Sequence, residues 1–114
     1  MHEMGIAEGI LSSALAGAAE AGGSRVNEVN VSVGVLTEVM ADALTFAWEA
    51  LRAGTIAEGA ALNVTMLDAR SACADCGHEW VHDRYSGSKC PACESYLVRL
   101  LAGRELKIDT IDID

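Results

Sequence analysis

Basic residues are scarce in this sequence of 114 residues, in which eight Lys and Arg face 17 Asp and Glu and the formal net charge is −9. A surface that binds nucleic acid needs Lys and Arg to contact phosphates, so this composition argues against a nucleic-acid partner. No run of 18 apolar residues occurs, and the first residues lack the basic start of a signal peptide. We therefore expect no membrane span and a cytoplasmic protein, whose thiols stay reduced.

Aromatic side chains are also few, and they are Phe46, Trp48, Trp80, Tyr85 and Tyr96. The core must therefore consist mostly of Val, Leu, Ile and Ala. Because hydrophobic residues still make up 51% of the chain, a disordered acidic tail is excluded. A core of this size supports a fold with a modest reserve of stability, which a structural metal or oligomerisation would increase.

Periodicity of the apolar residues predicts two helices and three strands. Helical spacing followed by glycine predicts helices over 6–21 and 41–53. Alternation of apolar and polar residues predicts strands over 26–36, 62–67 and 106–113. The last alternation slips by one residue at Asp109-Thr110, where we expect a bulge or bend.

Residues 70–98 differ from the rest because they hold all four cysteines and lack regular periodicity. The chain is therefore expected to leave its main body near residue 69 and to return near residue 99. The predicted fold class is α+β: a small sheet of about three strands packed with two helices, plus an inserted zinc-ribbon-like module. The main domain would comprise 1–69 and 99–114, and the module 70–98.

The cysteines form two pairs, Cys73-x2-Cys76 and Cys90-Pro91-Ala92-Cys93, which are separated by 13 residues. Two such knuckles can close four thiolates around one tetrahedral ion, for which zinc is the default. The site would be structural, since four protein ligands leave no open position. A disulfide, a thioredoxin-type redox motif and a c-type haem fit less well, whereas rubredoxin-like iron stays open because its ligand set is the same.

Two histidines, His78 and His82, follow the first knuckle. The plainer interpretation is that both are solvated polar residues beside a metal site. The alternative is that His78 tunes the site, or exchanges with a thiolate as the pH falls.

The first three residues, Met1-His2-Glu3, offer a second set of metal ligands. The His2 imidazole together with nearby main-chain nitrogens would form a chelate that suits square-planar nickel or copper(II), and Glu3 would add a carboxylate. On this chemistry alone, a histidine at such a position is more often incidental than a ligand.

The sequence resembles the HypA/HybF family of hydrogenase nickel-incorporation proteins along its whole length. The shared features are the Met-His-Glu start, both cysteine knuckles, and the segments 33–36, 42–49, 58–60 and 103–108. Two knuckles alone are common to many zinc ribbons, but their combination with the Met-His-Glu start is highly specific.

The resemblance implies an α/β domain that binds nickel and a structural zinc module that signals metal state to it. It implies that nickel is bound by His2, the main-chain nitrogen of Met1 and often Glu3. The implied partners are a HypB-type GTPase and the large subunit of a [NiFe] hydrogenase, and some members also serve urease. Many relatives have proline before the acidic residue at the start of the second helix, where this chain has Ala41, so a role for Asp42 in binding nickel stays open. Some relatives recruit a histidine of the zinc module, and whether His78 or His82 has that role stays open as well.

Other functional classes find less support in the sequence. The alternative is a zinc-ribbon interaction module without nickel delivery, although such modules are usually basic. No nucleophile with a base partner, no phosphate-binding glycine loop and no open metal position is evident, so we expect a protein that is not an enzyme. Both a monomer and a domain-swapped dimer fit the sequence.

Overall fold

The computed structural model describes residues 2–114, which divide into two compact units. The first unit comprises the chain up to Ser32, together with Val39–Thr65 and Lys107–Asp114. The second comprises Val33–Glu38 and Met66–Leu106. The second unit is wider than the predicted insertion over 70–98 and includes a short segment from the first half of the chain.

Helix α1, Glu3–Glu20, begins three residues before the predicted start and buries a stripe of apolar side chains, three of them alanine. The stripe consists of Ala7, Ile10, Ala14 and Ala18. The helix ends because Gly22 adopts a positive φ of 72° and the Gly23 N–H donates to the Ala18 carbonyl oxygen at 2.8 Å. Glycine adopts this conformation without steric cost, which is why the predicted stop is found there.

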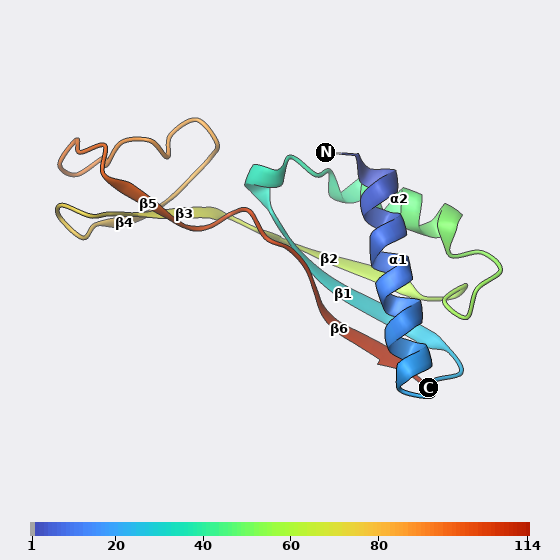
Figure 1. Cartoon of the computed structure of the whole chain (residues 1–114). Helices are drawn as coiled ribbons and strands as arrows, with labels where there is room; N and C mark the ends of the chain where they lie inside the picture. The colour runs from blue at the N-terminus through green and yellow to red at the C-terminus, as the bar shows by residue number, and fades with distance from the viewer. Residues whose placement is uncertain (1) are drawn as a thin grey trace. The chain divides into compact units, whose positions relative to one another are not determined.

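Three strands form one sheet in the order β2-β1-β6, with bounds Ala61–Leu67, Val26–Gly34 and Leu106–Ile113. Both helices lie over the same face of this sheet (Figure 1). The central strand supplies Val29 and Val31 to the core, and both are fully buried. The predicted class, two helices packed with a small three-stranded sheet, is therefore confirmed.

The slip in the apolar–polar alternation of β6 is visible in the hydrogen bonds of its side chains. Asp109 accepts a hydrogen bond from Ser32 Oγ at 2.5 Å, and the adjacent Thr110 Oγ1 accepts one from Asn30 Nδ2 at 2.9 Å. Ser32 and Asn30 stand two apart on β1 and share a face. Two neighbouring side chains of β6 therefore reach the same face, as a slip in the alternation requires.

Helix α2, Ala41–Leu51, packs against α1 and contributes the largest buried side chain, Trp48. The Trp48 Nε1–H donates to the Ala60 carbonyl oxygen at 2.9 Å. The side chain of Arg52 donates to the same oxygen at 2.5 Å. These two bonds fix the loop between α2 and β2.

The second unit has its own three-stranded sheet, in the order β4-β3-β5. The strands are Ala69–Cys73 for β3, Glu79–His82 for β4 and Val98–Ala102 for β5, and both pairings are antiparallel. This sheet was not predicted from the sequence.

The segment Val33–Glu38, which contains the short 3-10 helix η1 at Val35–Thr37, joins the second unit through backbone contacts. The Gly34 N–H donates to the Glu105 carbonyl oxygen and the Leu36 N–H to that of Gly103, both at 2.8 Å. Gly34 lies so close to the Gly103 backbone that a Cβ atom would overlap it. Glycine is therefore required at this crossing.

Among residues 2–114, no helix is long and apolar enough to cross a membrane.

Candidate metal sites

The four cysteines come from two knuckles with the same backbone geometry. Cys73 ends β3 and Cys76 lies in the turn before β4, while Cys90 and Cys93 lie in the loop before β5. In each knuckle the residue after the second cysteine has a positive φ, 78° at Gly77 and 66° at Glu94. Glycine occupies this position in the first knuckle, as a positive φ favours, but glutamate occupies it in the second.

Backbone hydrogen bonds repeat in the two knuckles as well. The N–H groups of Gly77 and Glu94 donate to the carbonyl oxygens of Cys73 and Cys90, at 3.0 and 2.9 Å. The N–H groups of Cys73 and Cys90 in turn donate to carbonyl oxygens five residues ahead, at 2.8 and 2.9 Å. The equal spacing of the two motifs therefore produces two matching loops that face each other.

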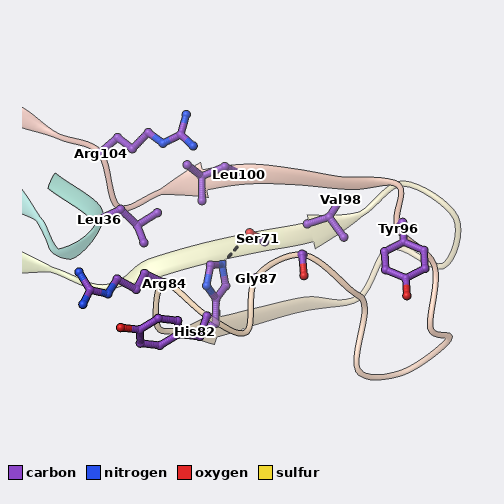
Figure 2. A pocket seen from close by; sticks show the side chains of 11 residues that line it. Leu36, Ser71, His82, Arg84, Gly87, Tyr96, Val98, Leu100 and Arg104 are labelled. Carbon is purple, nitrogen blue, oxygen red and sulfur yellow. Dashed lines mark hydrogen bonds between the residues drawn. The ribbon is translucent and has the colours of Figure 1, made fainter. Parts of the chain in front are cut away.

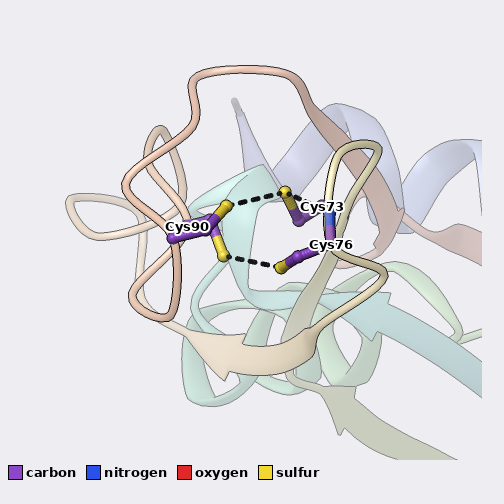
Figure 3. A group of neighbouring side chains, drawn as sticks. Cys73, Cys76 and Cys90 are labelled. Carbon is purple, nitrogen blue, oxygen red and sulfur yellow. Dashed lines mark hydrogen bonds between the residues drawn. The ribbon is translucent and has the colours of Figure 1, made fainter.

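The four sulfur atoms lie within 4.8 Å of one another (Figure 3). The Sγ atoms of Cys73 and Cys93 are 3.6 Å apart, as are those of Cys76 and Cys90. Four sulfurs around one tetrahedral zinc ion, each bonded at about 2.3 Å, stand roughly 3.8 Å apart. The cluster thus fits a four-thiolate metal site and could hold zinc.

Backbone N–H groups stabilise negative charge on the sulfur atoms. Cys76 N–H donates to Cys73 Sγ at 3.5 Å, and this bond is the main cause that lowers the pKa of the Cys73 thiol to about 7. Ala92 N–H donates to Cys90 Sγ at 3.4 Å. At Cys93 an N–H from Ser95 lowers the pKa, but the neighbouring thiols and desolvation together raise it to about 12. Four thiols this close cannot all ionise unless a cation is present, which is what a metal site requires.

The two histidines of this unit serve structural contacts. The ring of His78 stacks on Trp80, with centroids 5.8 Å apart and planes 8° from parallel. The carbonyl oxygen of His78 accepts the Cys73 N–H. The ring of His82 bonds to Ser71. Within the described part of the chain, neither imidazole has a hydrogen bond to a cysteine sulfur.

The predicted nickel ligands lie at the start of α1, in the first unit. His2 is exposed and is the N-cap of the helix, and its carbonyl oxygen accepts the Ile6 N–H at 3.2 Å. Met1, whose main-chain nitrogen the resemblance implies as a ligand, is outside the described residues.

The Glu3 carboxylate is held in place by another element of the same unit. Its Oε2 atom accepts the Met40 N–H at 3.2 Å, and this bond is the main cause that lowers the pKa of Glu3. Met40 is the N-cap of α2, where free N–H groups favour a negative charge. Sequence reasoning missed this contact because no local pattern links two residues so far apart.

Asp42 lies in the first turn of α2, two residues after the backbone group that holds Glu3, and its side chain is exposed. The Glu3–Met40 bond therefore brings the start of α2 to the start of α1.

The family model described as "Hydrogenase/urease nickel incorporation, metallochaperone, hypA" matches residues 1–113. The hydrogenase maturation factor HypA of Rhizobium leguminosarum is 37% identical over 113 residues, which cover 99% of both chains. That of Chlorobium luteolum is 36% identical and covers 100% of this chain and 97% of its own.

Solved structures agree with the fold. The solution structure of the nickel metallochaperone HypA from Helicobacter pylori superposes with a TM-score of 0.70 at 19% identity, covering 99% of this chain and 97% of that one. A second HypA solution structure gives a TM-score of 0.73 at 19% identity, with coverage of 99% and 96%. The match to the family model runs from the Met-His-Glu start through both cysteine knuckles, and the chain therefore belongs to the HypA family.

Proposed function

We propose that this protein is a nickel metallochaperone, which binds nickel(II) through His2, Glu3 and the main-chain nitrogen of Met1. It would deliver the ion, with a HypB-type GTPase, to the large subunit of a [NiFe] hydrogenase. The family description also names urease as a destination for nickel. The observation that carries the proposal is the full-length family match, which includes the Met-His-Glu start. Membership of a metallochaperone family also supports a carrier rather than an enzyme.

The contact between Glu3 and the Met40 N–H supports a role for Glu3 in binding nickel. A carboxylate kept ionised and fixed beside an exposed imidazole offers a hard ligand at little cost in side-chain entropy. His2 is exposed and Glu3 is half-buried, so a partner can reach both groups and exchange its own ligands for them. These features suit an ion that must be bound and then released.

We propose that Cys73, Cys76, Cys90 and Cys93 hold a structural zinc ion in the second unit. The spacing of the sulfur atoms and the two N–H···S bonds support this assignment. Nickel binding would then belong to the domain formed by 1–69 and 99–114, and zinc to the module over 70–98. Metal analysis of the purified protein distinguishes zinc from rubredoxin-like iron, which would also give a visible absorption band.

The decisive experiment is metal analysis of untagged protein offered equimolar nickel and zinc. We expect His2→Ala to abolish stoichiometric nickel while zinc content stays unchanged, and Glu3→Gln to weaken nickel binding about tenfold. Glu8→Gln, at an exposed position further along α1, is the matched control and should bind nickel normally. One equivalent of nickel retained by His2→Ala would contradict the proposal and favour a zinc-ribbon interaction module without nickel delivery.

A further inference from the structure

A pocket of about 600 Å³ lies in the second unit, over one face of its sheet (Figure 2). Its floor is apolar where Val98 and Leu100 project from β5. Its wall is the loop after β4, which contributes Arg84 and Gly87. The cysteine cluster does not line this pocket, so it is a separate feature of the unit.

The two arginines that line the pocket carry positive charge. Arg84 forms an ion pair with Glu38 and lies over the ring of Tyr85, 5.0 Å from its centroid. Arg104 is exposed and has no hydrogen bond or ion pair within residues 2–114. Of the described residues that line the pocket, none is Asp or Glu.

This lining is unusual for such an acidic chain. The first unit has ten acidic and three basic residues, whereas the second has seven acidic and five basic. The basic residues are thus concentrated in the second unit. Two of them line one pocket, where Arg84 is paired with Glu38 and Arg104 is the positive charge without an ion-pair partner within residues 2–114. An anionic ligand is therefore favoured there over a cation.

A hydrogen-bond chain fixes the middle of the pocket. The His82 Nδ1 atom is 2.5 Å from the carbonyl oxygen of Asp83, which can only accept, so Nδ1 carries the proton. Nε2 then accepts the hydroxyl proton of Ser71 at 2.7 Å, and Ser71 is only 1% exposed. A Cβ atom at Gly87 would overlap the His82 ring. These contacts hold the His82 ring in one position at the pocket.

We propose that this pocket binds an acidic segment of a partner polypeptide. A Glu or Asp carboxylate of the partner pairs with Arg104, whose planar guanidinium can donate two parallel hydrogen bonds. A neighbouring apolar side chain of the partner packs on Val98 and Leu100.

The exposed aromatic residues at the pocket favour a polypeptide over a small anion. Tyr85 and Tyr96 line the pocket and are 76% and 74% exposed. Tyrosine and arginine are the residues that most often dominate the energy of protein–protein contacts. Two exposed tyrosines and two arginines together offer a larger contact area than a single carboxylate group can cover.

The test measures fluorescence anisotropy of a short labelled peptide in which glutamate alternates with leucine, titrated with the zinc-loaded full-length protein. We expect this peptide to bind and the same peptide with lysine for glutamate not to bind. Arg104→Gln should raise the Kd about tenfold, whereas Arg104→Lys should retain part of the affinity. The matched control is Arg99→Gln, because Arg99 alternates with the lining residues of β5 and is exposed on the other face.

A second variant tests the shape of the pocket. Gly87→Ala should displace the His82 ring and weaken the peptide without changing zinc content. Should this variant lose zinc, the surface variant Arg104→Gln decides the question, since the exposed Arg104 side chain forms no hydrogen bond or ion pair within residues 2–114. The proposal is overturned if both peptides bind alike, if neither binds, if Arg99→Gln weakens binding as much as Arg104→Gln, or if N-acetylglutamate competes as well as the peptide.

Discussion

Backbone N–H groups, more than side chains, prepare the charged groups of both candidate metal sites. The Met40 N–H holds the Glu3 carboxylate, and N–H groups of Cys76 and Ala92 reach the sulfur atoms of the knuckles. A backbone donor does not titrate, and only substitution by proline removes it. The lowered pKa values of Glu3 and Cys73 therefore depend on the backbone at the start of α2 and in the first knuckle.

This arrangement predicts how nickel binding depends on pH. Glu3 has a pKa below its ordinary value of 4.5, so it stays ionised while the pH falls from about 8 to about 5. Binding nickel through His2 and a main-chain nitrogen requires both groups to be deprotonated, so protons compete with the ion for them as the pH falls. We expect the nickel affinity measured by calorimetry to fall at least about tenfold across the window. Glu3→Gln should bind more weakly yet show the same slope, and a flat profile in the parent protein would count against His2 as a ligand.

At the scale of elements, sequence periodicity predicted the long, regular helices and strands. Helix α2 and strand β1 were predicted because their apolar residues repeat over many positions, and both are confirmed. The four-residue strand β4 was missed, since so short an alternation does not stand out from a loop. The four cysteines were found together because their spacing is a local signal.

Contacts between distant segments could not be predicted in the same way. The crossing of Gly34 with Gly103 and the bond between Glu3 and Met40 depend on how the elements pack. Glu94 shows an intermediate case. Its positive φ matches that of Gly77, so the equal spacing of the two knuckles could have suggested it although glutamate rarely adopts this conformation.

Substitution of glycine by alanine should have opposite effects on stability at the backbone crossing and in the exposed middle of α1. Gly34→Ala places a Cβ atom against the Gly103 backbone, which cannot rotate away, and should lower the free energy of unfolding by about 3 kcal/mol. Gly9→Ala, in the exposed middle of α1 with nothing within 4 Å of its Cβ position, should raise it by about 0.8 kcal/mol. Urea denaturation measures both. Equal stability of Gly34→Ala and the parent would mean that the two backbones are further apart.

At the scale of the whole molecule, each unit carries its own tryptophan. Trp48 is buried in the core of the first unit, and Trp80 lies on β4 in the second, between the rings of His78 and His82. The two units therefore differ in their natural fluorescent reporter as well as in charge.

Metal removal should affect these two reporters differently. If the cysteine cluster holds the proposed zinc ion, a chelator removes the cation that joins the two knuckles. We expect Trp80 emission to shift to the red and β4 to become labile to proteolysis. In the Trp80→Phe variant the remaining Trp48 emission should barely change, because the first unit has a core of its own. A large shift of Trp48 on chelation would contradict independent stability of that unit.

The chain passes between its two units four times, after Ser32, Glu38, Thr65 and Leu106. During synthesis, strand β1 and the segment Val33–Glu38 emerge long before their partners in β6 and at Gly103. The first unit lacks its last strand until β6 leaves the ribosome. The second unit lacks the backbone bonds of Gly34 and Leu36 until residues 103–105 have emerged. We therefore expect neither unit to complete its fold before residues 103–113 have left the ribosome, so that neither is finished in time to guide the folding of the other.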